Sequence, residues 1–240
     1  MATSIDAIID RQFRRWDLER SMGHRAESSH EITPAVHPLL TVSREHGSMG
    51  SAIAASLADR FGYTLLHRDV IDRMCESTGY SRRLLEALDD RSRSNMATWF
   101  DSMVGGLYFD STDYVRALFT TLYSIARLGG VVIVGRGANF IVGSERGFHV
   151  RVVAPREARI RAIAERKGIS PREAAHEVAA RDHERAEFVR RLFHRSADDP
   201  LAYDLVVNSS GTSPRTVAEW LAVAARQKFE RLVPLGAAAR

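Results

Sequence analysis

Short apolar segments alternate with longer segments whose apolar residues recur at helical spacing, and this alternation limits the possible folds more than any other feature. The segment Val131–Val134 is a continuous β-branched run, typical of a strand buried on both faces. Such strands joined by helices indicate a parallel sheet covered by helices on both sides. We expect five strands, over residues 39–43, 64–66, 131–134, 148–153 and 205–207.

The helices between these strands carry recognisable start signals. Ser170-Pro-Arg-Glu173 has the capping-box pattern, in which the serine and the glutamate each bond the other's backbone N–H. Pro155 stands at the first turn of another predicted helix. We expect helices over residues 50–61, 69–77, 81–90, 112–128, from 155 onward, 170–194 and from 214 onward.

The N-terminal segment stands apart from this alternation. Residues 4–22 have apolar side chains at helical spacing, namely Ile5, Ile8, Ile9, Phe13 and Trp16. Residues 23–37 are mostly polar and predict a linker. We therefore divide the chain into residues 1–36, a helix and linker, and residues 37–240, an α/β domain with a helical region at about 155–195. The helix is either an ordinary edge helix or an arm that forms a homodimer.

Composition excludes several classes of protein. An apolar content of 45% in 240 residues supports a sizeable core, and no run of about 18 apolar residues predicts a membrane span. Cys75 is the single cysteine and the N-terminus lacks a secretory pattern, so we expect a cytoplasmic protein. The net charge is +4, but acidic residues interleave with the arginines and no aromatic platform accompanies them. Nucleic acid is not an expected partner.

The loop after the first strand carries the main functional signal. Gly47 and Gly50 lie between a strand end and a helix start, where backbone N–H groups and the helix dipole attract phosphate. The alternative is a loop that only closes a strand–helix turn. The phosphate-loop pattern G-x-x-x-x-G-K-[ST] also requires a lysine, and this segment has none. We expect the donor phosphates to contact Arg44, Gly47, Ser48, Met49, Gly50 and Ser51.

Charged residues follow the other strands at the same expected edge of the sheet. Arg136 lies between two glycines after a buried strand, which favours anion binding. Asp69 either caps its helix or contacts a ligand, and Arg73 lies one turn further. Glu45 is a candidate for holding Mg²⁺ through water or for positioning an acceptor. Alternatively, Arg44 and Glu45 pair with each other or with surface charges.

The predicted helices after residue 155 are rich in arginine. Acidic residues alternate with the arginines, so a solvated, charge-laced helix pair explains most of them. The sharper hypothesis is a mobile lid that supplies one or two arginines to a transferring phosphoryl group.

An ordered set of motifs resembles the cytidylate kinase-like family, a branch near the nucleoside monophosphate kinases. The set is Ser-Arg-Glu-His-Gly-Ser-Met-Gly, Val-Gly-Arg-Gly-Ala-Asn, Ala-Pro-Arg-Glu-Ala-Arg-Ile-Arg, Arg-Asp-His-Glu-Arg-Ala-Glu-Phe and Tyr-Asp-Leu-Val-Val-Asn-Ser, from about residue 39 to residue 221. The resemblance implies a phosphate-loop kinase fold with a helical acceptor region and a lid, using ATP and Mg²⁺. It further implies donor phosphates on residues 47–51, acceptor phosphate on Arg136, Arg73 and Arg181, and lid arginines at Arg159 and Arg161.

The departures from that family pattern concern the catalytic groups. Gly50 stands at the lysine position, Ala52 at the threonine position, Met49 at a loop glycine, and Gly137 at the aspartate of Gly-Arg-Asp. Losing one preorganised donor costs on the order of 10²–10³ in rate. One hypothesis is ATP-dependent phosphoryl transfer to a small phosphorylated or nucleotide acceptor, with Arg136, Arg159, Arg161 and Glu45 as catalytic residues. The alternative is a weak or inactive regulatory protein that binds a nucleotide or phosphometabolite.

Overall fold

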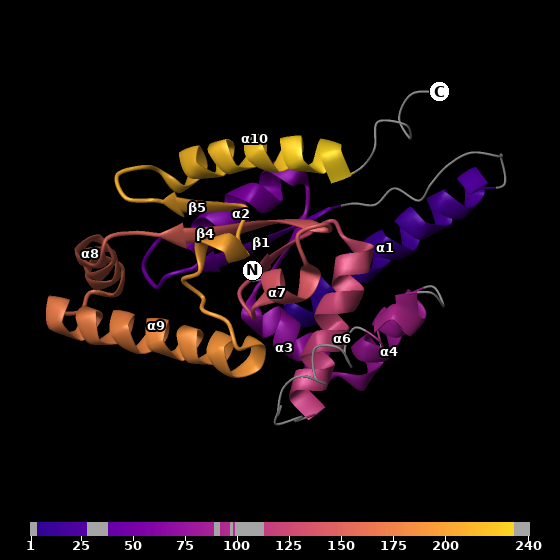
Figure 1. Cartoon of the computed structure of the whole chain (residues 1–240), viewed down its shortest axis with the longest axis horizontal. Coiled ribbons are helices and arrows are strands. Elements are labelled where there is room, and N and C mark those ends of the chain that lie inside the picture. Colours follow the sequence, from indigo (N-terminus) through magenta and orange to yellow (C-terminus); the bar gives the residue numbers. More distant parts are fainter. Residues whose placement is uncertain (1–3, 28–37, 89–91, 97, 99–112, 233–240) are drawn as a thin grey trace.

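The protein folds around a five-stranded parallel sheet. Its computed structural model describes residues 4–27, 38–88, 92–96, 98 and 113–232. The strands stand in the order β2-β3-β1-β4-β5 (Figure 1). They are β1 (Leu39–Arg44), β2 (Thr64–Leu66), β3 (Val131–Val134), β4 (Gly147–Val153) and β5 (Leu205–Asn208). All five expected strands therefore form.

The register brings the functional loops to one edge of this sheet. In the central strand β1, Val42 pairs with Val134 of β3 and with Val150 of β4. Because the three strands are parallel, the chain leaves β1 and β3 side by side. The N–H of Gly135 donates to the carbonyl of Val42 at 3.1 Å, which fixes the loop after β3 beside the loop after β1.

Helices cover both faces of the sheet, as Figure 1 shows. On one face lie α2 (Gly50–Phe61) and α10 (Pro214–Leu232), which share a core with the sheet through Leu57, Val150 and Leu221. The other face is covered by α3 (Arg68–Glu76), α6 (Asp113–Leu128) and the short α7 (Ala138–Val142), with α4 (Thr78–Glu86) packed against α6. This three-layer arrangement confirms the expected phosphate-loop kinase fold class. The helix α7 was not expected from the sequence.

The N-terminal helix α1 (Ile5–Glu27) packs into the apolar core on the face of the sheet that α3 and α6 cover. Ile9, Phe13 and Trp16 are buried there, and the Trp16 indole N–H donates to the carbonyl of Gly129 at 3.0 Å. The apolar stripe therefore packs on this chain's own core, as an edge helix does. The helix also continues to Glu27, so the predicted linker over 23–27 is wrong, and its remainder, 28–37, lies outside the described residues.

After β4 the chain forms a helical hairpin of α8 (Arg156–Lys167) and α9 (Pro171–Phe193). The predicted capping box is confirmed, because the Ser170 N–H donates to the Glu173 carboxylate at 2.9 Å and the Glu173 N–H donates to the Ser170 hydroxyl at 3.3 Å. A small apolar cluster around Ile163 and Val178 holds the two helices together. Figure 1 places this hairpin at one end of the sheet. A 3₁₀ turn, Pro200–Ala202, then leads to β5.

Among the described helices, none has the length and apolar character needed to cross a membrane.

Candidate functional site

A cavity of about 600 Å³ opens at the carboxyl ends of β1 and β3, beneath α9. Its walls come from the end of β1, the start of α3, the loop after β3 with the start of α7, one face of α9, Arg151 of β4, and the segment 197–203 before β5. Five of the sequence-predicted site residues line it, namely Arg44, Glu45, Asp69, Arg136 and Arg181. The parallel register is what brings these residues together, since they are spread over more than half of the chain.

The glycine loop beside this cavity is tightly fixed by its own hydrogen bonds. The buried Ser48 hydroxyl lies 3.0 Å from the carbonyl of Glu45 and 3.2 Å from that of Val152. The Ser209 hydroxyl, from the loop after β5, donates to the Ser48 carbonyl at 2.8 Å. Gly47 has a φ of 87°, in the left-handed region that favours glycine. The loop is therefore held in one conformation, and none of residues 47–51, the predicted donor-phosphate contacts, lines the cavity itself.

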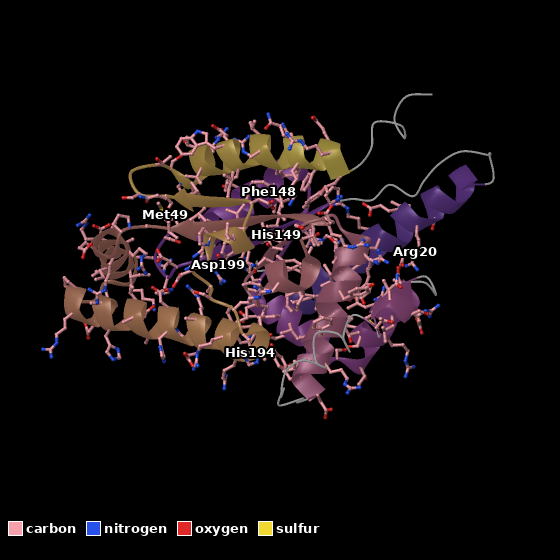
Figure 2. All side chains as sticks on the ribbon, viewed as in Figure 1. Arg20, Met49, Phe148, His149, His194 and Asp199 are labelled. Carbon is pink, nitrogen blue, oxygen red and sulfur yellow. The ribbon has the colours of Figure 1, made fainter. Side chains whose placement is uncertain are left out.

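Met49 is the strained residue of this loop. It is the N-cap residue of α2 and has a φ of 57°, a conformation in which a non-glycine residue is uncommon. Its side chain is 39% exposed and lies on the hairpin side of the sheet end (Figure 2). The preceding Ser48 and the following Gly50 are buried, so the strain is held in place by the packed loop.

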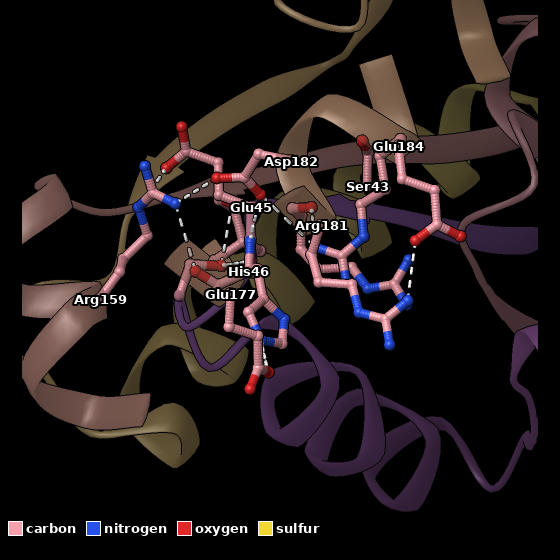
Figure 3. Close-up of polar contacts among 12 residues, drawn as sticks. Ser43, Glu45, His46, Arg159, Glu177, Arg181, Asp182 and Glu184 are labelled. Carbon is pink, nitrogen blue, oxygen red and sulfur yellow. Dashed lines mark hydrogen bonds and ion pairs between the residues drawn. The ribbon is translucent and has the colours of Figure 1, made fainter. Parts of the chain in front are cut away.

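Arg159, a predicted catalytic residue, is engaged by protein groups on every side. Its Nε donates to the Ala154 carbonyl at 2.9 Å and lies 3.3 Å from the Glu45 carboxylate, and its Nη1 donates to the His46 carbonyl at 3.2 Å. The same Nη1 forms an ion pair with Asp182 (Figure 3). With 7% of the residue exposed, this guanidinium braces the start of α8 against the glycine loop and α9.

The helix α9 is also bonded directly to the glycine loop. Asp182 accepts a hydrogen bond from the His46 backbone N–H at 2.7 Å, and Glu177 lies 2.7 Å from the His46 ring Nε2 (Figure 3). Burial lowers the pKa of His46 in spite of the Glu177 contact, which acts in the other direction. The Glu45 carboxylate accepts from the Ala154 N–H at 2.9 Å, so this predicted catalytic group also has a bracing role.

Arg136 is held at the end of β3 in a left-handed conformation, with a φ of 56°. It forms an ion pair with Asp72, whose carboxylate also accepts from the Tyr114 hydroxyl at 3.0 Å. The guanidinium lies 5.1 Å from the centre of the Phe188 ring, and its buried Nε has no hydrogen-bond partner in the described part of the chain. A cation fixed in this way can bind an anion without further ordering.

The ring of Phe193 accounts for Gly137, which stands after Arg136 where the family pattern has aspartate. A Cβ at this position would lie 2.7 Å from Cζ and 3.0 Å from Cδ2 of Phe193, the last residue of α9. The Phe193 ring stacks on Phe140 with 5.2 Å between the ring centres. A side chain at position 137 would therefore force the Phe193 ring out of its present place at the end of α9.

Arg44 has no counter-ion among the described residues, in contrast to five other arginines of the cavity, namely Arg68, Arg136, Arg151, Arg181 and Arg185. Within the described residues no hydrogen bond or ion pair engages its guanidinium, and its Nε is buried. Burial, and then the like charges of Arg185, Arg68 and Arg136, lower the pKa of Arg44 to about 10. The group still carries its charge at neutral pH, so it presents uncompensated positive charge to the cavity.

Two of the predicted site residues, Arg73 and Arg161, do not line the cavity, and two that do, Asp69 and Arg181, have partners of their own. Arg73 points to the N-terminal helix, where its Nε lies 2.9 Å from the Asp6 carboxylate. Arg161 is exposed on α8 and does not line the cavity. Arg181 lines it but donates to Glu184 at 2.8 Å (Figure 3). Asp69 is also at the cavity wall, 3.6 Å from Arg68.

Sequence reasoning missed several residues that the tertiary structure brings to the site. Arg68 and Arg185 line the cavity beside Arg44, and Asp72 holds Arg136. At the inner end, Arg151 donates to the Ser43 hydroxyl at 3.2 Å and pairs with Asp198. The available signal for Arg185 was its place one helical turn after Arg181, which put both on one face of α9.

The described residues contain no group of three or more histidine, cysteine, aspartate or glutamate side chains arranged to hold a metal ion.

Comparisons with known proteins agree with this geometry. The model of the cytidylate kinase-like family matches residues 39–211. The cytidylate kinase of Ignicoccus hospitalis is 33% identical over 94 residues, which are 39% of this chain and 55% of that protein. The cytidylate kinase of Pyrococcus horikoshii is 34% identical over 92 residues, which are 38% of this chain and 47% of that protein. The chain thus spans about half the length of the curated relatives it matches.

A solved structure supports the fold alone. The crystal structure of an uncharacterized protein from Eubacterium ventriosum superposes with a TM-score of 0.61 at 16% identity, covering 79% of this chain and 99% of that one. The family match extends from β1 to the loop after β5, so it contains the sheet, the cavity and the α8–α9 hairpin. The chain therefore belongs to the cytidylate kinase-like family.

Proposed function

We propose that this protein transfers a phosphoryl group from ATP to a small acceptor that already carries a phosphate, such as a nucleotide. The observation that most supports this proposal is that one cavity at the carboxyl ends of the strands is lined by four arginines, Arg44, Arg68, Arg136 and Arg185. Phosphoryl transfer depends mostly on positioning and on stabilisation of charge, which guanidinium groups supply.

The roles divide between the glycine loop and the cavity. Donor phosphates would meet the N–H groups of residues 47–51 at the start of α2, where the helix dipole adds positive charge. Mg²⁺, when bound with the nucleotide, would neutralise the phosphates, and the exposed Ser51 hydroxyl is the side chain of the loop that would hold it. Arg136, oriented by Asp72, would bind the acceptor phosphate.

Arg159 and Glu45 would act by bracing the loop rather than by contacting the transferring group. Both are bonded to the Ala154 backbone, and Arg159 also joins the loop to α9. An acceptor whose reacting atom is a phosphate oxygen needs no general base near neutral pH, because the second pKa of a phosphate monoester is about 6.

The test is ADP release from Mg²⁺–ATP by the full chain, with a panel of nucleoside monophosphates and other phosphate monoesters. Each acceptor is paired with its dephosphorylated counterpart. We expect turnover only with a phosphorylated acceptor, and a loss on the order of 10²-fold in kcat/KM for Arg136→Ala. Arg172→Ala, on the exposed side of α9, is the matched control. Equal turnover of phosphorylated and dephosphorylated acceptors would refute the proposal.

A second candidate is a nucleotide or phosphometabolite sensor without catalysis. Two observations favour it: residues 44–52 contain no lysine, and the Asp182 carboxylate already occupies the N–H of His46. Tight binding of nucleotide without turnover of any acceptor in the same panel would select this candidate.

Nucleic acid remains an unexpected partner. The arginines of α9 are paired with carboxylates one turn away, Arg181 with Glu184 and Arg190 with Glu187. This pairing supports a solvated helix surface rather than a phosphate-binding stripe.

A further inference from the structure

Two residues of the glycine loop have exchanged their chemical types relative to the phosphate-loop pattern. In G-x-x-x-x-G-K-[ST] the first position is glycine, the seventh is lysine and the eighth carries a hydroxyl. The same eight positions in this chain are residues 44–51, with Arg44 first, Gly50 seventh and Ser51 eighth. The cation is thus present, but it stands at the strand end instead of the helix start.

The structure gives a steric reason why the exchange involves both positions. A Cβ added to Gly50 would lie 2.5 Å from the Cβ and 3.0 Å from the Cγ of Arg44. Real Cβ atoms do not approach so closely, and the Cβ of Arg44 cannot be moved without moving the backbone. A side chain at position 44 and a side chain at position 50 therefore exclude each other.

A second glycine makes room for the far end of the same side chain. A Cβ on Gly135, in the loop after β3, would lie 2.5 Å from Nη1 of Arg44. Arg44 thus extends from the start of α2 to the end of β3, through space left open by Gly50 and Gly135. Its own carbonyl is held by the Nη1 of Arg185 at 3.2 Å. The side chain is positioned by packing, whereas its charged end is left without a partner among the described residues.

We propose that Arg44 is the phosphate-binding cation of this loop and takes the part that lysine at position 50 has in the common pattern. Its ligand class is the polyphosphate chain of the donor. This assignment rests on the proposed function for the identity of the donor, but it concerns binding and is tested without an acceptor. An unpaired guanidinium surrounded by three others is unfavourable in the free protein, and a bound polyanion relieves that repulsion.

The test measures binding of inorganic triphosphate with Mg²⁺ by calorimetry. Arg44→Ala should weaken the affinity about 10- to 100-fold, the range expected for a hydrogen-bonded ion contact. Arg44→Lys should lose less. Arg215→Ala, whose side chain is 84% exposed on α10, should bind as the parent protein does. Unchanged triphosphate affinity in Arg44→Ala would overturn the assignment, as would equal losses in the alanine and lysine variants.

Restoring glycine at position 44 and lysine at position 50 tests whether the cation of the loop has moved between these two positions. Arg44→Gly should bind weakly, and Arg44→Gly with Gly50→Lys should recover at least 10-fold in triphosphate affinity. Gly50→Lys alone should not bind well, since Arg44 occupies the space. A folded double variant that binds no better than Arg44→Gly would overturn the assignment. If the double variant does not fold, the comparison of Arg44→Ala with Arg44→Lys decides.

Thermal unfolding separates a binding role from a structural one. Arg44→Met removes an unpaired charge from among other arginines, so its Tm should equal or exceed that of the parent while triphosphate affinity falls. A lower Tm together with an unchanged affinity per folded molecule would show a structural residue and overturn the proposal. Loss of triphosphate binding in the Arg44 variants, with no acceptor turned over by any protein, would refute the proposed function and leave this assignment standing.

Discussion

Substituting Gly137 by alanine tests whether the end of α9 is seated on the Gly-Arg-Gly loop. Gly137 has a φ of 62°, and a Cβ there would lie 2.7 Å from Cζ of Phe193. A non-glycine residue in the left-handed region costs about 1–2 kcal/mol. Forcing an extra carbon into a packed contact costs about 1–3 kcal/mol more. The expected loss in unfolding free energy is therefore about 3 kcal/mol, measured by urea denaturation.

Gly168→Ala provides a control that has the strain without the clash. Gly168 has a φ of 65°, nearly that of Gly137, and a Cβ there would meet nothing within 4 Å. We expect this variant to lose only about 1 kcal/mol, the backbone term alone. The difference between the two alanine variants isolates the contact with Phe193.

A double-mutant cycle of Gly137→Ala and Phe193→Ala measures the contact between these two positions. In Phe193→Ala the ring is absent, so adding Gly137→Ala should cost only the backbone strain. The two substitutions should therefore couple by about 2 kcal/mol, well outside the roughly 0.5 kcal/mol seen for independent sites. Additive effects would refute the seating of α9 on this loop. The result bears on function, because Gly137 lines the cavity next to Arg136.

Three further outcomes follow from single side chains. Met49→Gly should raise the unfolding free energy by about 1 kcal/mol in thermal denaturation, since the left-handed conformation suits glycine; a loss of stability would contradict the strain. Arg159→Ala should cost about 3 kcal/mol because Glu45 and Asp182 lose their partner, whereas the exposed Arg161→Ala should stay within about 0.5 kcal/mol in the same urea assay. Burial lowers the pKa of His149 below its value in the unfolded chain, which is near 6.5. The unfolded state therefore takes up a proton at a higher pH than the folded state does, and the free energy of unfolding should fall as the pH drops below about 6.5. His149→Gln should flatten this decline, and an unchanged slope would exclude His149 as its source.

The buried position of His149 gives that pH dependence its physical basis. The ring lies in β4 at the centre of the sheet (Figure 2). Its Nδ1 is 2.8 Å from the Thr41 hydroxyl, and its Nε2 is 2.9 Å from the Gly143 carbonyl. A carbonyl only accepts, so Nε2 carries the proton and Nδ1 accepts from Thr41. A second proton on Nδ1 would reverse that hydrogen bond and would place a positive charge on a buried ring, which burial disfavours.

Elements with a local cause could be predicted from the sequence. The five strands follow from short apolar runs, and the start of α9 follows from Ser170 and Glu173, which are close in the chain. Boundaries were less certain where the signal was weak: α1 continues to Glu27 past Gly23, and the short α7 has too few residues to show a helical period. The parallel sheet then placed the loops after β1 and β3 at one edge.

The partners of individual arginines could not be predicted, because each depends on residues far away in the chain. Arg73 and Arg159 looked alike as candidates, yet one pairs with Asp6 on α1 and the other with Glu45 and Asp182. Helical spacing tells which face of its own helix a residue occupies, but not which carboxylate another element brings to it.

The sequence by itself determined a covered parallel sheet, a glycine loop at the end of its central strand, and the absence of lysine from that loop. These properties depend on residue order and on local periodicity. Only the tertiary structure decided which cation faces the cavity. The choice depends on space and pairing: Gly50 and Gly135 leave room for Arg44, whereas Arg136 after β3, Arg151 of β4 and Arg185 of α9 each have a carboxylate nearby. Steric exclusion and ion pairing act between strands and helices distant in sequence, and for that reason they appear only once the chain is folded.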